Sequence, residues 1–558
     1  MRSIRIMVSG QAIYVEAEYD LRLLCKTVSP YAWLKDRHVW QYPATPSIAG
    51  ALAVAFRQAG KIEGDDAYLA LLGQYHRALE DSQRARDGAP ETVPEIPITS
   101  PDAPPWLHQR RAFAFCKPLA GAMLAMAMGV GKSRVAIDLM QNRGHRRVLV
   151  LCPRAVVSVW QEQVRLYAVK PVRAVYLDGG DVKQKLQRMQ WHCEAFDRQS
   201  NPEEMCLVVV NYESARTTAM AAWLLGQSWD LVVLDESHRL KAPSGITSRF
   251  VARLCAQAPY RLGLTGTPMP HSLLDVFAQY RAIDRNIFGV AYTPFRARYG
   301  VFGGYGNHEL VSYQHEEELR EKFYSIAFRV TAEEVLELPE QQHVYRTFAL
   351  TGEGARVYRE MERDMIAQVQ SGEIVASNAL VRLLRLQQVT SGFLPTGDGQ
   401  RIERVDRGKE GLLDDILNDV APHEPLVVFA RFRHDLSVIR AVCQASGRTV
   451  SELSGSAHEL EAWHMGKTDV LVAQIQSGSV GIDLTRAHYC FLYSLGYNLA
   501  EYEQALKRLH RAGQRQSVTY VHLLARGTVD EQVYRALRER KDVIDRVLEE
   551  FKHAEISS

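Results

Sequence analysis

An apolar run, a glycine pair and a lysine-serine step follow one another in the string GAMLAMAMGVGKSRV. Gly129 and Gly131 carry no Cβ, so backbone N–H groups, that of Val130 among them, can close on an anion. Lys132 adds a point charge, and the hydroxyl of Ser133 is a ligand that Mg²⁺ accepts. Because these residues open a helix whose positive end faces the anion, the string indicates a loop that binds a nucleotide's phosphates.

One position departs from the usual spacing of such a loop. Met126 stands where that spacing asks for a glycine. A glycine-containing turn before an ordinary helix is therefore an open alternative, and the rest of the chain has to decide between the two.

Two further apolar runs end in polar side chains. Asp235 and Glu236 follow LVVL, and Thr265 follows LGL. If both runs are parallel strands, these side chains lie at the carboxyl edge of a sheet, where such folds bind ligands. Asp235 would then hold Mg²⁺ through water, Glu236 would orient and deprotonate an attacking water, and Thr265 would sense the γ-phosphate. The alternative for the acidic pair is a surface turn, which the buried strand directly before it disfavours.

Gln109 lies a helix's length before the phosphate loop. At that distance its amide could read the edge of an adenine. The alternative is an amide on the surface of a helix.

The elements that must position these residues are short apolar runs that alternate with helical segments. Their leucine-rich and β-branched composition suits strands that are buried on both faces. The expected strands are Val148–Cys152, Leu207–Val210, Leu231–Leu234 and Leu262–Leu264. This alternation predicts an α/β fold with a doubly wound parallel sheet.

A second set of such strands is expected near the C-terminus, at Leu426–Ala430, Val470–Ala473 and Tyr489–Tyr493. The string QALKRLHRAGQ follows them. Arg508 and Arg511 lie three residues apart in it, so on a helix they would share a face and reach one phosphate cluster. A solvated basic helix is the alternative.

The chain is too long for one core, and we expect several units. Residues 1–61 show two hairpin patterns and a helix, with Trp33, Trp40 and Tyr42 either in the core or, with Lys35, Arg37 and His38, facing DNA. Residues 271–420 lack evenly spaced buried strands, so we expect them not to continue the first sheet. The expected units are a small α+β domain at 1–61, a helix and proline-rich linker at 62–104, a first lobe at 105–270, a helical insertion and linker at 271–420, a second lobe at 421–527, and a C-terminal helix bracing the lobes at 528–558.

Composition says little about function. The net charge is +2 with a pI near 8.1, so any contact with nucleic acid must come from local basic patches. The eight cysteines form no C-x-x-C pair, which favours buried free thiols in a reducing compartment. No uninterrupted apolar stretch is long enough to span a bilayer, so we expect a cytosolic protein without a membrane partner.

Taken in order, the motifs resemble the helicase-like motor of the Swi/Snf-type family within helicase superfamily two. The resemblance runs from about Pro104 to Glu550 and rests on MGVGKS, LCP, NYE, DESHRLK, LTGTP, QQVTSG, VVFARF, SGSVGIDLT, QALKRLHRAGQ and GTVDEQV. Each string is short, but ten in the family's order are specific. The resemblance also explains Met126, because such motors commonly lack the first glycine of the loop.

The resemblance implies two RecA-like lobes that bind ATP and Mg²⁺ between them and ratchet along duplex DNA. Arg508 and Arg511 would stabilise charge on the transferring phosphoryl group, and Gly481 and Asp483 would couple the ATP site to DNA. The residues expected to contact DNA phosphates are Arg154, Lys241, Arg431 and Thr485.

Two positions depart from the family pattern, and residues 1–61 suggest a second resemblance. Met126 and Ala127 replace an acidic pair, which puts some support of the magnesium site in doubt, and Tyr497 replaces a tryptophan.

The hairpin-helix pattern of residues 1–61 is similar to the HARP domain of annealing helicases. That similarity implies binding to forked or branched DNA.

From these observations we expect a monomeric, ATP-dependent translocase on double-stranded or branched DNA that serves DNA repair, fork remodelling or the removal of bound proteins in a bacterium or phage-infected cell. A strand-separating helicase and a non-catalytic DNA-binding scaffold with a vestigial ATP site are the alternatives. Intact Lys132, Asp235, Glu236 and Arg511 argue against the scaffold.

Overall fold

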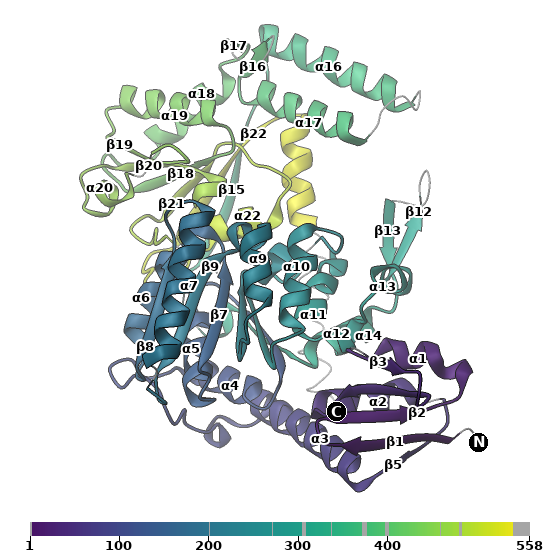
Figure 1. Ribbon diagram of the computed structural model, residues 1–558. Helices are drawn as coiled ribbons and strands as arrows, with labels where there is room; N and C mark the ends of the chain where they lie inside the picture. The colour runs from purple at the N-terminus through teal and green to yellow at the C-terminus, as the bar shows by residue number, and fades with distance from the viewer. Residues whose placement is uncertain are drawn as a thin grey trace. The chain divides into compact units, whose positions relative to one another are not determined.

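The structure is a computed structural model that describes residues 3–28, 30–57, 59–199, 201–240, 242–270, 272–303, 309–335, 338–370, 376–396, 401–457, 459–478 and 482–539. The chain divides into two compact units, Met1–Val335 and Leu336–Ser558. Each unit is described by itself below. Figure 1 shows the elements of both.

The first unit begins with a five-stranded sheet in the order β3-β4-β2-β1-β5. Its strands are β1 (Ser3–Ser9), β2 (Ala12–Glu16), β3 (Ala32–Leu34), β4 (Val39–Pro43) and β5 (Lys61–Gly64), and its helices are α1 (Arg22–Thr27), α2 (Pro46–Phe56) and α3 (Asp66–Asp87), with a 3₁₀ turn at Tyr19–Leu21. The two expected hairpins are confirmed as β1–β2 and β3–β4. Gly10 makes the first turn with a φ of 59°, and the Thr45 side chain caps α2 by accepting from the Ile48 N–H.

The three aromatic residues of this domain divide between core and surface. Trp40 and Tyr42 are buried, and the Tyr42 hydroxyl donates to the carbonyl of Cys25. Trp33 is 40% exposed.

The boundary expected at residue 61 is wrong. It cuts through β5, which pairs in parallel with β1, and it separates the domain from α3, whose Tyr68 is part of the same core. The sequence of β5, KIEG, is too short and polar to indicate a strand without its partner.

The stretch expected to be a linker lies against the first lobe. We call residues 93–100 the strap. Val93 and Ile96 are buried in it, and its backbone at Ile98 exchanges two hydrogen bonds with the Asn142 side chain. The Thr99 hydroxyl accepts from Arg134 at 2.7 Å. Proline and acidic residues indicated a free linker, but these contacts tie the strap to the helix that follows the phosphate loop.

The first lobe is built on a seven-stranded parallel sheet in the order β14-β6-β11-β10-β7-β9-β8. Its strands are β6 (Gly121–Met126), β7 (Arg147–Cys152), β8 (Val172–Leu177), β9 (Met205–Asn211), β10 (Leu231–Asp235), β11 (Tyr260–Thr265) and β14 (Ala327–Val330). Its helices are α4 (Leu107–Cys116), α5 (Lys132–Asn142), α6 (Val157–Tyr167), α7 (Val182–Gln199), α8 (Tyr212–Ala215), α9 (Thr218–Leu225), α10 (Ile246–Cys255), α11 (Val276–Ile283), α12 (Arg285–Phe288), α13 (Tyr292–Tyr299), α14 (Glu316–Tyr324) and α15 (Ala332–Val335). A two-stranded hairpin of β12 (Gly300–Gly303) and β13 (Glu309–Tyr313) extends from α13 (Figure 1).

The expectation that residues 271–420 do not continue the first sheet is wrong. The strand β14 pairs in parallel with β6 at the edge of that sheet, and its four residues, AFRV, were too few to stand out between two helical stretches.

The second unit contains a six-stranded parallel sheet in the order β15-β22-β21-β18-β20-β19. Its strands are β15 (Gln341–Phe348), β18 (Leu426–Ala430), β19 (Val450–Leu453), β20 (Val470–Gln474), β21 (Tyr489–Leu492) and β22 (Val518–Ala525), with a separate hairpin of β16 (Phe393–Thr396) and β17 (Arg401–Arg404). Its helices are α16 (Gly352–Gln370), α17 (Ala376–Thr390), α18 (Gly408–Asn418), α19 (Arg433–Ala445), α20 (Leu460–His464), α21 (Ile475–Gly478) and α22 (Leu499–Leu506), and residues 529–539 are also helical. The strand β15 shows that the second sheet likewise takes a strand from the expected insertion.

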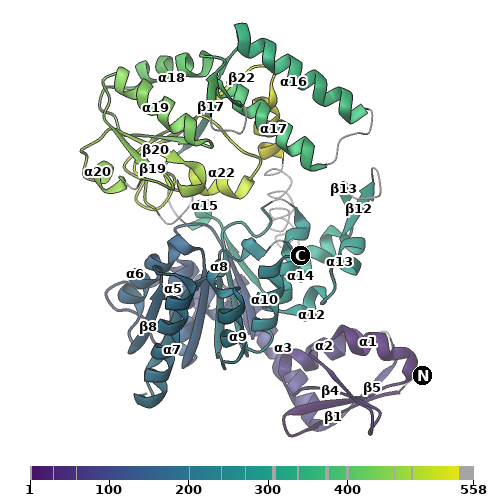
Figure 2. The same cartoon turned by 45° about the horizontal axis from the view of Figure 1, so that its top comes forward.

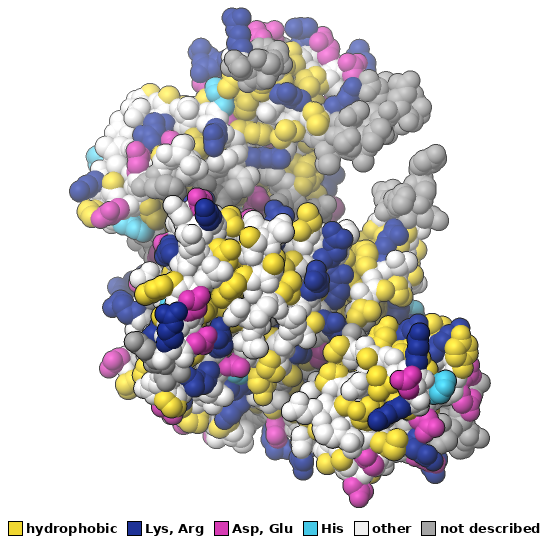
Figure 3. All heavy atoms as spheres, viewed as in Figure 1, with side chains coloured by type: hydrophobic (Ala, Val, Ile, Leu, Met, Phe, Trp, Pro, Cys, Tyr) yellow, Lys and Arg dark blue, Asp and Glu magenta, His cyan; other side chains and the backbone are white. Residues whose placement is uncertain are grey.

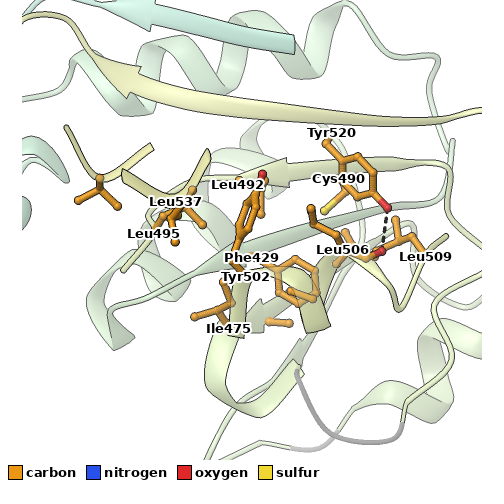
Figure 4. Packing of buried hydrophobic residues seen from close by; sticks show 14 of the residues in the cluster. Phe429, Ile475, Cys490, Leu492, Leu495, Tyr502, Leu506, Leu509, Tyr520 and Leu537 are labelled. Atoms are coloured by element: carbon orange, nitrogen blue, oxygen red, sulfur yellow. Dashed lines mark hydrogen bonds between the residues drawn. The ribbon is translucent and has the colours of Figure 1, made fainter. Parts of the chain in front are cut away.

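Alternate residues of β18 face two hydrophobic cores. Val428 packs with α18 and α19 on one face, and Val427 and Phe429 pack with α17, α22 and the C-terminal helix on the other. Figure 2 shows the helices of the two faces, and Figure 4 shows the second core, where the Tyr520 hydroxyl donates to the carbonyl of Leu506 at 2.7 Å. Both lobes therefore have the expected doubly wound parallel architecture.

All eight cysteines are buried free thiols. Acidic and basic side chains are interspersed on the face shown in Figure 3, in keeping with the small net charge. Of the helices that the structure describes, none combines the length and the apolar character needed to cross a bilayer.

Candidate nucleotide-binding site

The predicted site residues of the first lobe come together at one edge of its sheet. The strands β6, β11 and β10 are neighbours and parallel, so their carboxyl ends lie side by side. The phosphate loop follows β6, Asp235 ends β10, and Thr265 ends β11. This is the edge at which open parallel sheets bind ligands.

The phosphate loop has the backbone conformation that its glycines were expected to allow. Gly129 and Gly131 have φ values of 81° and 90°, and Gly131 is the N-cap of α5. The Lys132 ammonium donates to the carbonyls of Met126 and Ala127, each at 3.0 Å. Because the acceptors are backbone carbonyls, these hydrogen bonds of Lys132 do not depend on which side chains stand at Met126 and Ala127.

Gln109 and its neighbour His108 both contact the backbone of the phosphate loop. The Gln109 amide donates to the carbonyl of Val130 at 3.1 Å, and His108 Nε2 lies 2.9 Å from the same oxygen. Burial lowers the pKa of His108, which favours the neutral ring that can donate here. Gln109 is buried, so the alternative of a surface amide is wrong. Its amide contacts the phosphate loop in this structure, and the contact with an adenine stays a prediction.

Asp235 is fixed by donors on three sides. The indole N–H of Trp160 donates to its Oδ2 at 2.8 Å, and the N–H of Glu236 donates to its Oδ1 at 3.0 Å. The hydroxyl of Tyr212 donates to its backbone carbonyl at 2.9 Å. Burial and the Glu236 charge raise the pKa of Asp235 to about 7, while Trp160 and the charge of Lys132 act in the opposite direction. The alternative interpretation of the Asp235–Glu236 pair as an acidic turn on the surface is therefore wrong.

Glu236 has an unusual backbone conformation for a residue with a side chain, with a φ of 50°. Its Oε2 lies 3.3 Å from His238 Nδ1, and that nitrogen also lies 3.0 Å from the Thr265 hydroxyl. Within the described part of the chain, Glu236 Oε2 and the Thr267 hydroxyl are buried without a hydrogen-bond partner. Such polar atoms at a sheet edge indicate a ligand or ordered water.

The structure locates part of the predicted DNA contacts. Arg154 is exposed directly after β7 at the same edge, whereas Lys241 and Gly481 lie outside the described residues. In the second unit, Arg431 donates to the side chain of Gln387, and burial lowers the pKa of its guanidinium. The hydroxyl and N–H of Thr485 both donate to Asp483, at 2.7 and 2.9 Å.

The expectation that Arg508 and Arg511 share a helix face is wrong. The helix α22 ends at Leu506, and both arginines lie in the turn that follows it. The carbonyl of Arg508 accepts from the N–H of Leu484, which takes it out of a helical pattern. Arg508 is buried, which also rules out a solvated basic helix, and Arg511 donates to the carbonyl of Ile482 at 3.3 Å.

The residues present fit a nucleotide with Mg²⁺. The loop supplies N–H groups and Lys132 for phosphate, Ser133 supplies an oxygen ligand that Mg²⁺ accepts, and Asp235 supplies a carboxylate that could hold the ion through water. The buried Oε2 of Glu236 makes no hydrogen bond among the described atoms beyond its 3.3 Å approach to His238 Nδ1, so it can accept from a water. Sequence reasoning missed Trp160 and Tyr212, although a buried indole N–H generally requires an acceptor.

Comparison with known families accounts for most of the chain. Residues 63–391 match the family described as SNF2-related domain. The chain belongs to this family. Residues 408–513 match the helicase conserved C-terminal domain, so the expected membership in the Swi/Snf-type helicase-like ATPases and the expected fold with two RecA-like lobes are confirmed. The similarity of residues 1–61 to a HARP domain stays a prediction.

Individual relatives of the chain are distant. It is 25% identical over 452 residues to chromodomain-helicase-DNA-binding protein 1-like of Mus musculus, which covers 77% of this chain and 48% of the mouse protein. It is 23% identical to putative protein p41 of Acyrthosiphon pisum secondary endosymbiont phage 1, covering 76% and 94%, and 21% identical to the DNA repair and recombination protein RAD54-like of Gallus gallus, covering 78% and 65%. The chain thus spans about half the length of the mouse protein. Among solved structures it is similar to the SWI2/SNF2 ATPase core of Sulfolobus solfataricus in complex with dsDNA, with a TM-score of 0.38, 19% identity, and coverage of 81% of this chain and 94% of that one.

Proposed function

We propose that this SNF2-related chain hydrolyses ATP to ADP and phosphate and uses the energy to translocate along double-stranded DNA. The observation that carries the proposal is the meeting of the phosphate loop, the Asp235–Glu236 pair and Thr265 at one sheet edge. A loop that binds phosphate, a carboxylate for Mg²⁺ and a second carboxylate for water are what phosphoryl transfer to water requires.

In this proposal each residue has one task. The loop and Lys132 bind the β- and γ-phosphates, and Ser133 and Asp235 would hold Mg²⁺, which would neutralise charge on the phosphates. Glu236 accepts the proton of the attacking water. Arg508 and Arg511 stabilise the charge on the transferring group.

Contacts with DNA are proposed for Arg154, Lys241, Arg431 and Thr485, which would follow the phosphate backbone without reading sequence. The names of the mouse and chicken relatives refer to DNA binding and to DNA repair, which supports a DNA substrate. We therefore propose a role in repair, fork remodelling or the clearance of bound proteins.

The first test is ATP hydrolysis without DNA, with single-stranded DNA and with duplex DNA. Duplex should stimulate the wild type, and Lys132→Ala should abolish the activity. Lys170→Ala is the control, because Lys170 precedes β8 at the opposite edge of the sheet and pairs with Glu203. Equal background rates in all conditions would identify a non-catalytic scaffold.

The second test separates translocation from strand separation. A translocase displaces the third strand of a triplex and leaves the duplex intact. Unwinding of a blunt duplex at a comparable rate would instead support the strand-separating helicase.

We also propose that the N-terminal domain binds forked or branched DNA. The test compares the affinity of the full chain with that of a chain lacking the domain, on forked and on linear duplex. An unchanged ratio of the two affinities would refute this proposal.

A further inference from the structure

We propose that Trp160 is a positioning residue that holds the Asp235 carboxylate in place for the magnesium ion. This inference rests on the ATP site of the proposed function and adds a residue from a different helix to it. Trp160 lies 75 positions before Asp235 in the sequence, on α6, and its indole N–H meets Asp235 Oδ2 at 2.8 Å.

The contact is buried on both sides. Trp160 is 1% exposed and Asp235 is 6% exposed. Water therefore competes little for the indole N–H or for Oδ2, and a hydrogen bond to a charged group is strong in such surroundings.

Two hydrogen bonds, from two different elements of the fold, restrict the rotation of the Asp235 carboxylate. Oδ1 accepts from the N–H of Glu236, which belongs to the same turn, and Oδ2 accepts from Trp160 on α6. Because the two oxygens turn together about the Cβ–Cγ bond, the second hydrogen bond restricts a rotation that the local bond opposes alone without it. With the indole in place, the remaining lone pairs of both oxygens keep one orientation, which would favour holding a magnesium ion through water.

The chemistry of the donor matters as well as its position. An indole N–H donates and cannot accept, so it satisfies the ionised carboxylate and never competes for a proton. Groups that orient metal ligands in this way commonly change metal affinity by about 10-fold to 100-fold when they are removed.

The test is Trp160→Phe, which keeps an aromatic ring in the core and removes the N–H. A fluorescent ADP analogue is titrated in EDTA and then at increasing Mg²⁺ concentrations, in the absence of DNA. We expect unchanged affinity in EDTA and an increase of about 10-fold in the Mg²⁺ concentration needed for half-maximal enhancement. Trp229→Phe is the matched control, because the Trp229 indole is also buried in this lobe and donates to a backbone carbonyl, that of Leu224.

A double-mutant cycle keeps the proposal testable if Trp160→Phe destabilises the lobe. In the Asp235→Asn background the substitution of Trp160 should have no further effect on Mg²⁺ dependence, since its target carboxylate is gone. Trp160→Phe and Trp229→Phe are compared at equal thermal stability. The proposal is overturned if Trp160→Phe needs the same Mg²⁺ concentration as the wild type for half-maximal enhancement. It is also overturned if the substitution of Trp160 changes this concentration equally in the wild-type and the Asp235→Asn backgrounds. A chain that shows the Mg²⁺ shift but no DNA stimulation would instead contradict the translocase function alone.

Discussion

The buried carboxyl of Asp435 makes the stability of the second unit depend on pH. Asp435 lies in the first turn of α19 with no exposed surface, and its Oδ2 accepts from Ser494 at 2.5 Å and from Ser391 at 3.4 Å. Its Oδ1 has no hydrogen-bond partner in the described part of the chain. Burial raises the pKa of Asp435 to about 7, against the opposing effects of Ser494 and of the Lys409 charge.

The sign of the effect follows from the direction of this change. The folded chain holds the proton up to about pH 7, whereas the unfolded chain releases it near the ordinary value of 3.8. The free energy of unfolding therefore falls as the pH rises from about 4 through 7. The total loss is about 4 kcal/mol, of which about 2 to 3 kcal/mol falls between pH 5 and pH 8.

Asp435→Asn mimics the protonated acid and should remove this dependence. The assay is urea unfolding at several pH values with 5-fluorotryptophan in place of tryptophan. The fluorine resonance of Trp463, the one tryptophan after residue 335 and fully buried, reports on the second unit. Asp415→Asn, at an exposed position of α18, is the control and should keep the wild-type slope. Equal slopes for Asp435→Asn and the wild type would refute the reasoning.

Three further predictions concern the first lobe. Glu236→Gln should keep nucleotide affinity but lower kcat by about 10²-fold to 10⁴-fold in an ATPase assay, because the base for water is lost. Gly131→Ala should abolish binding of a fluorescent nucleotide, since its φ is 90° and a Cβ would lie 2.2 Å from Gln109 Nε2. Thr99→Val should lower the free energy of unfolding of this lobe by about 1 to 2 kcal/mol in urea titrations, because the hydroxyl that accepts from Arg134 is removed.

Each of these predictions has a control on the chain. Glu203→Gln removes an exposed carboxylate and should leave kcat unchanged. Gly73→Ala adds a Cβ with no atom within 4 Å in the helix α3 and should be neutral or stabilising. Thr92→Val removes an exposed local hydrogen bond, to the carbonyl of Ala89, and a loss of stability equal to that of Thr99→Val would contradict a special role for the strap.

Central strands, including those followed by candidate site residues, were predicted from the sequence better than the strands at the edges of the two sheets. Central strands such as β10 and β18 are continuous apolar runs because both faces are buried, and β18 was predicted at its observed bounds. The edge strand β15 reads QQHVYRTF and is exposed along most of its length, so it has no apolar run to detect. Its pairing with β22 joins residues more than 170 positions apart and can be found only in the folded chain.

The same limit applies within the site. The glycines, Lys132 and the Asp235–Glu236 pair were predictable because their types and spacing are local. The contact of Trp160 with Asp235 depends on where α6 lies over the sheet, which no local pattern encodes. The end of α22 before Arg508 was likewise set by a hydrogen bond from a distant loop, that of Leu484.

The strap has a consequence for how the N-terminal domain can be studied. A chain that starts at residue 105 loses the domain but also loses Thr99 and the backbone at Ile98, which bind Arg134 and Asn142 on the phosphate-loop helix. Reduced ATP turnover in such a truncation would therefore say nothing about what the domain binds. A cut near Gly88, between α3 and the strap, removes the domain with its whole core and leaves the helix its partners.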